Sequence, residues 1–252
     1  MIITKSVLAN NFELENSIHL IKIHSPEIAK NCSPGQFCNF KVSDSNFPLL
    51  RRPFSICDVD GENIYFIFSI YGEGTRLLAQ KKVGDLIDIL GPLGNGFNLK
   101  DEYDTAVIVA GGLGAAPFPF LTKLLPKDKK LYTFIGGRSS IDVITYGMKN
   151  IFISTDDGSL GFKGNVIELL QENKNILDTG RIKIFACGPN AMLKALKSFC
   201  EINNYNCEAS TECAMACGFG ICQGCPIETA DREGYYLVCK DGPVFNIKKV
   251  NL

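Results

Sequence analysis

The chain has 252 residues, of which 46% are hydrophobic and 21% are charged, so it can bury a substantial core as one large domain or as two modest ones with an appendage. Its formal net charge is −1 and its Lys and Arg residues are scattered, which excludes the basic footprint of a nucleic-acid-binding protein. No apolar run approaches the ~18–20 residues that span a bilayer, and we expect no signal peptide at the N-terminus.

Eleven cysteines are present, and they need an explanation other than a secreted disulfide scaffold. Their number is odd, and a chain of this length does not need disulfides to hold its fold. In a reducing compartment, closely spaced thiols indicate metal or redox chemistry. The composition therefore predicts a cytoplasmic protein with a thiol-based site.

Residues 1–100 contain short segments rich in β-branched and aromatic residues, separated by turns. Strands are expected at Ser17–Ile23, Gly35–Val42, Phe54–Val59 and Asn63–Ile70. The dipeptide Asp60-Gly61 is typical of a hairpin turn. Several strands at close spacing predict a small antiparallel β-barrel.

From Thr105 onward, apolar strands alternate with helical patterns. The continuous apolar run Ala106–Ala110 is typical of a parallel strand that is covered on both faces. Further strands are expected at Leu131–Ile135, Asn150–Ser154 and Lys183–Ala186, and helices at Val166–Gln171 and Asn190–Phe199, the second with Asn190 as its N-cap. This alternation predicts a doubly wound α/β domain.

After about residue 208 the alternation gives way to a segment rich in cysteine and glycine. We therefore expect three parts: a β-barrel domain over residues 1–100, an α/β nucleotide-binding domain over residues 101–207, and a small C-terminal module over residues 208–252.

The C-terminal module contains Cys217-x4-Cys222-x2-Cys225, followed by Cys239. This is the plant-type spacing for a [2Fe–2S] cluster, in which three thiolates come from one tight loop and the fourth from a returning segment. Glycines 218, 220 and 224 permit positive φ angles and leave backbone N–H groups free to point at the sulfurs.

A structural zinc site is the main alternative for this segment. Zinc ribbons usually present two short Cys-x2-Cys pairs, and here the second pair is missing. Cys213 can replace one ligand under either interpretation. The remaining thiols are expected to be small buried hydrophobic groups, and they are Cys32, Cys38, Cys57, Cys200 and Cys207.

Two motifs lie in the predicted barrel. Arg52-Pro53-Phe54-Ser55 falls on an expected strand, and taken alone it has the composition of an ordinary strand start. Gly72-Glu-Gly74-Thr75 precedes a short helical run, Arg76–Gln80. Glycines ahead of a helix leave amides and the helix dipole available for a phosphate, although a simple turn has the same composition.

Three loops follow expected strands of the α/β domain: Gly111–Pro117, Thr155–Ser159 and Cys187–Pro189. A glycine turn between a parallel strand and a helix allows a dinucleotide pyrophosphate to approach the backbone. Because the carboxyl ends of the strands border one crevice, we expect the three loops to face one ligand.

The order of these motifs resembles the ferredoxin–NAD(P) reductase superfamily. The segments Met215–Cys222 and Cys239–Phe245 are similar to the electron-transfer subunits of two-subunit, NAD-linked dihydroorotate dehydrogenases, and they are the most specific part of a resemblance that covers nearly the whole chain. Phe54 stands where many members of the superfamily have Tyr, so a hydroxyl contact to the flavin is absent.

The resemblance implies a barrel that binds FAD, an α/β domain that binds NAD(H), and a [2Fe–2S] cluster held by Cys217, Cys222, Cys225 and Cys239. It implies that Arg52 pairs with the flavin diphosphate, that Phe54 packs on the isoalloxazine, that Ser55 lies near its reactive edge, and that Cys187 lies beside the nicotinamide. The further cofactor-binding residues that it implies are Pro53, Ser69, Ile70, Gly72, Gly74, Thr75, Gly111, Gly112, Gly114, Asp157, Gly158, Gly188 and Pro189.

The predicted function is electron transfer between NAD(H) and a partner dihydroorotate dehydrogenase subunit that carries FMN, in a heterotetramer with two copies of each subunit. No acid–base residue is predicted, because no Ser-His-Asp, Walker or His-Glu-x-x-His motif occurs. The alternatives are a reductase subunit for another acceptor, such as a ferredoxin, a sulfide or a hydrogenase system, and a zinc-stabilised binding module. The preference for NAD over NADP follows from the resemblance alone, since Arg138-Ser139-Ser140 could hold a 2′-phosphate.

Overall fold

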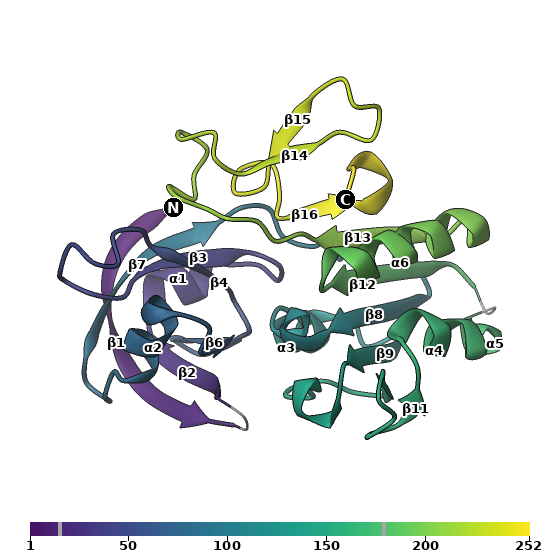
Figure 1. Ribbon diagram of the computed structural model, residues 1–252, viewed down its shortest axis with the longest axis horizontal. Helices are drawn as coiled ribbons and strands as arrows, with labels where there is room; N and C mark the ends of the chain where they lie inside the picture. Colours follow the sequence, from purple (N-terminus) through teal and green to yellow (C-terminus); the bar gives the residue numbers. More distant parts are fainter. Residues whose placement is uncertain (15–16, 178–179) are drawn as a thin grey trace.

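The computed structural model describes residues 1–14, 17–177 and 180–252. Its N-terminal half is a seven-stranded antiparallel sheet with strand order β4-β3-β7-β1-β2-β6-β5. The strands are β1 (Ile2–Glu13), β2 (Ile18–His24), β3 (Phe37–Lys41), β4 (Arg52–Ser55), β5 (Asp58–Asp60), β6 (Asn63–Ser69) and β7 (Leu86–Leu93). The purple and blue part of Figure 1 shows them curling around a common core.

The curl brings the β4 edge of the sheet against β6, two strands that are not hydrogen-bonded neighbours. Phe54 on β4 contacts Phe68 on β6 with ring centroids 5.5 Å apart, and Phe40 on β3 contacts Phe66 at 4.7 Å. These rings belong to one buried cluster that α1 (Pro26–Asn31) and α2 (Glu73–Ala79) help to close. The predicted antiparallel barrel is confirmed.

The expected single strand Phe54–Val59 is wrong, because the chain bends and changes partner there. The Ile56 N–H donates to the Gln36 carbonyl, and the Cys57 N–H donates to the Tyr65 carbonyl. Two short strands, β4 and β5, therefore replace one long one. The Asp60-Gly61 hairpin is confirmed, since Asp60 pairs with Asn63 and Gly61 has φ +57°.

The second half is a sheet with strand order β11-β10-β9-β8-β12-β13-β16, in which every pair is parallel except β13–β16. Its strands are β8 (Thr105–Gly111), β9 (Lys130–Gly137), β10 (Ile151–Thr155), β11 (Phe162–Lys163), β12 (Ile182–Cys187), β13 (Asn206–Ser210) and β16 (Val244–Asn246). The carboxyl ends of the parallel strands thus meet at one edge.

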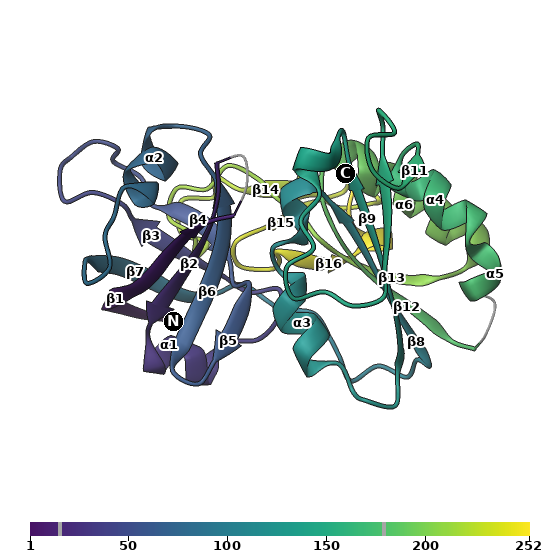
Figure 2. The same cartoon turned by 90° about the horizontal axis from the view of Figure 1, so that it is seen from below.

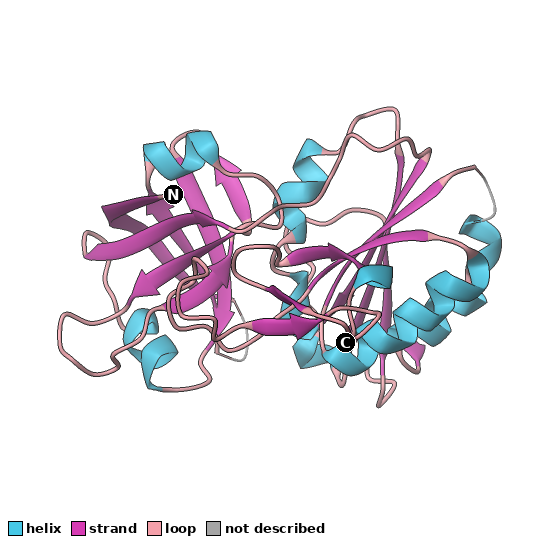
Figure 3. Cartoon of the chain, turned by 90° about the horizontal axis from the view of Figure 1, so that it is seen from above, coloured by secondary structure: helices cyan, strands magenta, loops and turns pink. Residues whose placement is uncertain are grey.

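Helices cover both faces of this sheet, as the cyan ribbons of Figure 3 show. Val107 and Val109 of β8 join the core under α4 (Val166–Glu172) and α6 (Asn190–Asn203), while Ile108 faces the core under α3 (Phe118–Leu124). Short α5 (Lys174–Leu177) follows α4. The doubly wound α/β prediction is confirmed.

The start of α6 corrects one prediction. Pro189, with φ −57° and ψ 145°, is the N-cap, and Asn190 is already the first helical residue. The tight Cys187-Gly188-Pro189 turn ends in an extended residue, so the helix begins one position earlier than an Asn190 N-cap would require.

The C-terminal segment bridges the two sheets, lying across the top of both in the view of Figure 1 and over the junction between them in Figure 2. It forms the hairpin β14 (Pro226–Glu228) and β15 (Tyr235–Leu237), then β16 and a short 3₁₀ turn, Ile247–Lys249. β13 crosses the expected boundary at residues 207/208, and β16 extends the α/β sheet. The division into residues 1–100, 101–207 and 208–252 remains a proposal, in which the last part shares a sheet with the second.

Within the described residues, no helix has the length and apolar character needed to cross a membrane.

Candidate functional site

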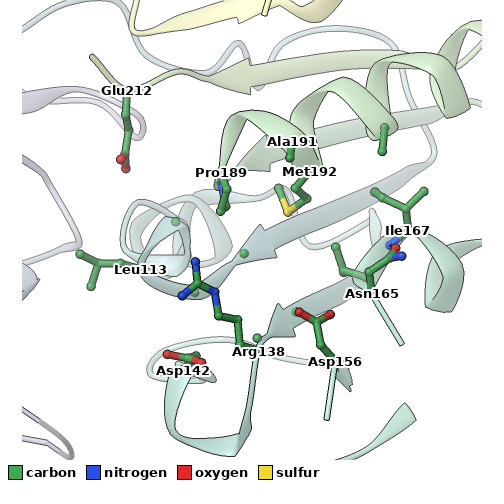
Figure 4. Close-up of a pocket in the computed structure, with 18 residues that line it drawn as sticks. Leu113, Arg138, Asp142, Asp156, Asn165, Ile167, Pro189, Ala191, Met192 and Glu212 are labelled. Atoms are coloured by element: carbon green, nitrogen blue, oxygen red, sulfur yellow. The ribbon is translucent and has the colours of Figure 1, made fainter. Parts of the chain in front are cut away.

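A cavity of about 800 Å³ opens at the carboxyl ends of β8, β9, β10 and β12 (Figure 4), and we call it the strand-end cavity. Its walls include Gly111–Gly114, Gly136–Arg138, Asp156 and Gly188–Pro189. All three loops predicted to face one ligand contribute to it.

Close backbone contacts explain the glycines on this wall. A Cβ atom on Gly114 would lie 2.4 Å from the Cys187 carbonyl oxygen, and one on Gly111 would lie 2.8 Å from the Met192 sulfur. Gly112 has φ +53°, a left-handed conformation that favours glycine. A 3₁₀ turn, Gly112–Ala115, leads from β8 toward α3. The wall is therefore free of side chains where a dinucleotide would need to approach the backbone.

Three of the predicted residues do not line the strand-end cavity: Asp157, Gly158 and Cys187. The Asp157 carboxylate accepts hydrogen bonds from the Ser159 hydroxyl at 2.6 Å and the Ser159 N–H at 2.8 Å, which hold its pKa below the usual range. It therefore shapes the loop that carries Asp156. Cys187 is 1% exposed, and burial raises the pKa of its thiol.

Charged side chains stand at both ends of the strand-end cavity. Arg138, Asp142 and Asp156 gather at one end, and Glu212 stands at the other (Figure 4). Asp142 is held in place because its carboxylate accepts a hydrogen bond from the Ser139 N–H at 3.1 Å.

A second cavity, of about 460 Å³, adjoins the first and is called here the barrel cavity. Pro53, Phe54, Ser55, Ser69 and Thr75, all predicted, line it, together with Phe37, Phe68 and Tyr71 from the barrel. Its other walls come from Leu113 and Ala116 of the α/β domain and from Ser210–Cys213, Met215 and Pro243. An apolar, aromatic lining with a few hydroxyl groups suits a planar heterocycle.

Four predicted residues, Arg52, Ile70, Gly72 and Gly74, lie outside this lining. Arg52 nevertheless packs on the start of α2, because a Cβ atom on Gly74 would lie 2.5 Å from its Nε atom. The Thr75 hydroxyl accepts hydrogen bonds from the N–H groups of Tyr71 and Gly72 at 2.9 and 3.1 Å. The structure thus brings the two predicted barrel motifs together.

The four predicted ligand cysteines form two pairs. The Cys222 N–H donates to the Cys217 sulfur at 3.5 Å, and the sulfurs of Cys225 and Cys239 are 3.1 Å apart. Cys222 is exposed, whereas Cys225 and Cys239 are buried. In the part of the chain that the structure describes, no three metal-binding side chains converge on one point.

Backbone N–H groups point at these sulfurs, as a thiolate cluster requires. Burial opposes ionisation of Cys217, but hydrogen bonds from the N–H groups of Cys222, Phe219 and Gly220 outweigh it and lower the pKa to about 6. Gly218 and Gly220 have φ +81° and +93°, as predicted. For Gly224 only half of the prediction is confirmed: Gln223, with φ +58°, makes the left-handed turn instead, but the Gly224 N–H donates to the Cys222 sulfur at 3.4 Å. The donor set of two thiol pairs fits an iron–sulfur cluster.

The cysteine segment also forms part of the barrel cavity. Cys213 lines that cavity, and burial, together with a hydrogen bond between its thiol and Cys225, raises the pKa of Cys213 to about 12. Phe37 on β3 lines the cavity from the other side and packs in the same buried cluster as Cys225 and Cys239. Asn39, two residues after Phe37 on the same strand, donates a hydrogen bond to the Cys217 carbonyl at 3.4 Å.

Sequence reasoning missed Leu113 and Glu212, the two residues that line both cavities. It also missed Tyr71 and Met215 as lining residues. Leu113 lies inside the predicted loop Gly111–Pro117, so it could have been predicted from the sequence as a lining residue. Glu212 carried no comparable signal, because it lies at the junction of β13 and the cysteine segment.

Residues 212–251 match the family model described as the iron–sulfur cluster binding domain of dihydroorotate dehydrogenase B. The chain is 38% identical over 255 residues to the dihydroorotate dehydrogenase B (NAD(+)) electron transfer subunit of Bacillus velezensis, covering 96% of each chain. It is 35% identical over 264 residues to the subunit of the same name from Fusobacterium nucleatum, covering 100% of each.

Two solved structures are similar in fold. The NADH-dependent reduced ferredoxin-NADP oxidoreductase has a TM-score of 0.86 at 24% identity, covering 98% of this chain and 90% of that one. A ferredoxin NADP⁺ reductase from Neisseria gonorrhoeae, solved with bound FAD and NADP, has a TM-score of 0.66 at 17% identity, covering 80% and 91%. At these identities the likeness shows the fold alone.

A curled antiparallel barrel, a doubly wound nucleotide-type sheet and a cysteine segment beside their shared cavities define the class of proteins with the ferredoxin-reductase fold. Within that class, the family is shown by the two relatives named above, which are 38% and 35% identical and cover 96% and 100% of this chain. The chain belongs to the family of electron-transfer subunits of NAD-linked dihydroorotate dehydrogenase B.

Proposed function

We propose that this chain carries electrons between NAD(H) and an FMN-containing dihydroorotate dehydrogenase subunit, by way of FAD and a [2Fe–2S] cluster. The observation that carries the proposal is the continuity of the three sites. Leu113 and Glu212 border both cavities, and Cys213 borders the barrel cavity while its thiol contacts Cys225.

We assign FAD to the barrel cavity. Phe54 and Pro53 supply flat apolar surface, and the hydroxyl groups of Ser55 and Ser69 supply polar contacts at its wall. Arg52, which packs on Gly74 at the start of α2, is positioned to neutralise a diphosphate. FAD, when bound, supplies the exchange between hydride transfer and single-electron transfer.

We assign NAD(H) to the strand-end cavity. The bare backbone at Gly111, Gly112 and Gly114 admits a pyrophosphate, and Gly188 and Pro189 form the facing wall. Asp157 and Gly158 act through the shape of their loop. The nicotinamide end is placed toward Glu212 and Leu113, because those two residues border the cavity assigned to the flavin.

We assign the cluster to Cys217, Cys222, Cys225 and Cys239. Two pairs of thiols provide two ligands for each of two irons, and the N–H groups that reach the sulfurs at 3.4–3.5 Å offset negative charge. The protein's own contribution is position and reduction potential, and no side chain here is required to act on an organic substrate.

The partner in this proposal is the subunit that holds FMN and dihydroorotate, in a heterotetramer with two copies of each chain. In the net direction, dihydroorotate and NAD⁺ give orotate and NADH. Phe219 and Ile221, 38% and 77% exposed, offer apolar surface on the cluster loop for docking. The eleven thiols fit a reducing compartment, and the cytoplasm is part of the proposal.

The test is anaerobic co-purification with the partner subunit, followed by cofactor analysis and an EPR spectrum of the reduced sample. We expect about one FAD and two irons per chain, and NAD⁺ reduction that depends on dihydroorotate. Stoichiometric zinc in colourless protein would contradict the proposal. NADH oxidation that is indifferent to dihydroorotate but responds to ferredoxin would instead assign another acceptor.

A further inference from the structure

Asn39 links the barrel to the loop that carries Cys217. It lies on β3 and is fully buried, and its Nδ2 atom donates a hydrogen bond to the Cys217 carbonyl at 3.4 Å. In Figure 1 the yellow-green cysteine segment runs over this part of the barrel. A side chain of the barrel core is therefore in contact with the backbone of the proposed cluster loop.

This contact depends on the absence of a side chain at position 218. A Cβ atom on Gly218 would collide with the Nδ2 atom of Asn39 and would lie 3.4 Å from a methyl carbon of Leu93. Gly218 also has φ +81°, a left-handed conformation that favours glycine. The glycine lets the buried amide reach the loop, and it makes the Cys217–Gly218 peptide easy to rotate unless that peptide is held.

The amide of Asn39 is unfavourable for the barrel itself. Its Oδ1 atom is buried and has no hydrogen-bond partner among the described residues. An unpartnered buried polar atom destabilises a fold, and a Leu side chain of similar volume would avoid that loss. The hydrogen bond to the Cys217 carbonyl is what an apolar residue at this position could not provide.

The Cys217–Gly218 peptide affects the direction of the N–H groups that follow it. The N–H groups of Phe219, Gly220 and Cys222 donate to the Cys217 sulfur, the last at 3.5 Å. If the peptide rotated, the N–H groups after it would turn away from that sulfur. The bond from Asn39 therefore holds the loop in the conformation in which the sulfur receives its donors.

Hydrogen bonds to the ligand sulfurs are among the factors that set the reduction potential of an iron–sulfur cluster. Reduction adds one negative charge, so N–H donors stabilise the reduced form more than the oxidised form. Donors that reach the sulfur raise the potential, and their loss lowers it.

Asn95 is a second link between the barrel half and the cysteine segment. Its Nδ2 atom donates to the carbonyls of Lys240 and Asp241 at 3.2 and 2.9 Å. Asn95 is exposed, so water can replace these bonds. The two carbonyls also follow Cys239 in the chain and do not precede N–H groups that donate to its sulfur. Asn39 is thus the better placed of the two to affect a ligand.

We propose that Asn39 is a positioning residue that raises the reduction potential of the [2Fe–2S] cluster by fixing the Cys217–Gly218 peptide. This inference rests on the function proposed above. Asn39 takes no part in electron transfer itself: one electron enters the cluster and leaves it again, and the anchored peptide changes only the equilibrium of that step.

The test is an EPR-monitored redox titration of the anaerobic holoenzyme with its partner subunit. Asn39→Leu keeps the volume of the side chain and removes the donor. One net hydrogen bond is worth about a factor of ten, so we expect the cluster's reduction equilibrium to fall about tenfold, which is about 59 mV for one electron. Iron content, FAD content and NADH affinity should be unchanged.

Asn173→Leu is the matched control. The Nδ2 atom of Asn173, at the end of α4, donates to the Leu169 carbonyl at 2.8 Å, a bond of the same kind within the α/β domain. Its loss should leave the cluster's potential unchanged, even if the variant is less stable.

A second comparison uses smaller side chains and tests the route through the peptide. Asn39→Ala should lower the potential as Asn39→Leu does. In Gly218→Ala the new methyl group displaces the amide, so adding Asn39→Ala to it should cause no further shift. Additive shifts would overturn the inference, because Asn39 would then act independently of the peptide.

Two other results would also overturn it. One is an unchanged potential in Asn39→Leu and Asn39→Ala. The other is loss of iron from both, which would show that Asn39 retains the cluster and does not tune it. If the wild type itself contains no [2Fe–2S] cluster, the proposed function fails instead.

Discussion

The strand-end cavity is lined mainly by residues that directly follow the strands of one sheet, whereas the barrel cavity draws its walls from three separate parts of the chain. In the first, Gly111 ends β8, Gly112 and Gly114 follow it, and Gly188 comes straight after β12. In the second, Phe54 of the barrel faces residues 113–116 of the α/β domain and residues 210–215.

This difference separates two ways of building a binding site. A parallel sheet places all its strand ends at one edge, so local strand–loop sequence is enough to assemble the strand-end cavity. The barrel cavity needs the two sheets and the cysteine segment to be held together over long sequence separations. Substitutions in the strand-end cavity should therefore affect that cavity alone. Substitutions at the contacts between the separate parts of the chain should affect both cavities.

The largest expected effect tests whether the cysteine segment is separable from the nucleotide site. Cys225→Ser should remove the cluster, lowering iron from about two per chain to near zero, because it removes a proposed ligand from the buried Cys225–Cys239 pair. NADH affinity, measured by titration, should stay within about twofold, since no residue of the strand-end cavity changes.

Two cysteine controls sharpen this result. Cys32→Ser, at the end of α1, should leave iron content unchanged. Cys213→Ser should also keep the iron, because Cys213 lies outside the four proposed ligands. Loss of iron in Cys213→Ser would show that Cys213 is a ligand and would contradict the assignment of the four cluster cysteines.

The next effect concerns the contact between the second sheet and the segment that joins β7 to β8. Lys183 on β12 is fully buried, donates to the Asn98 carbonyl at 2.7 Å, and pairs with Asp101 and with Glu208 on β13. Lys183→Met leaves these carboxylates without their cation and should lower the free energy of unfolding by ~3–5 kcal/mol, as measured by chemical denaturation.

Arg181, two residues earlier, is the matched control. It pairs with Glu102 and Asp104 on the surface, where all three side chains are at least half exposed, so Arg181→Met should leave stability nearly unchanged. Similar losses in both variants would show that the buried contacts of Lys183 with Asn98 and Asp101 stabilise the fold no more than a surface ion pair does.

A smaller effect is expected inside the strand-end cavity. In Gly114→Ala the new methyl group would lie 2.4 Å from the Cys187 oxygen and 2.7 Å from the Gly188 Cα atom, and both are backbone atoms that cannot move alone. The variant should lose ~1–3 kcal/mol of stability, and its NADH affinity should fall while its iron content stays normal.

Gly234→Ala provides the comparison, because nothing lies within 4 Å of a Cβ atom at Gly234. It should match the wild type in melting temperature and in NADH titration. A Gly114→Ala protein that also matched the wild type would mean that the wall relaxes easily and that close packing does not define the cavity.

The same contrast explains how far sequence reasoning reached. The apolar run Ala106–Ala110 predicted β8 and both of its buried faces, and the glycines after it predicted the cavity wall. β1 and β7 were missed, because their alternation is interrupted by polar residues that only the barrel context explains. Glu212 was missed as a lining residue because its place depends on two cavities meeting, which no local pattern encodes. The α6 N-cap was predicted one residue too late, because the extended residue before the helix is Pro189 and not Asn190.

The smallest predicted effect concerns the choice of nucleotide. Arg138 lies in the strand-end cavity at the end opposite Glu212, with Asp142 and Asp156 nearby (Figure 4). An ionic hydrogen bond is worth ~1.5–3 kcal/mol, so Arg138→Ala should weaken NADPH binding about 10-fold or more, measured by titration. NADH, which has a hydroxyl where NADPH has a 2′-phosphate, should lose no more than about threefold.

Lys149→Ala, which removes the same charge from an exposed site, should change neither affinity and so controls for net charge. Equal losses for the two nucleotides in Arg138→Ala would place Arg138 on the pyrophosphate. No loss for either would place the adenosine ribose elsewhere. A selective loss of NADPH binding would mean that Arg138 gives the cavity its affinity for the phosphate, and that the neighbouring carboxylates are what keep the wild type NAD-linked.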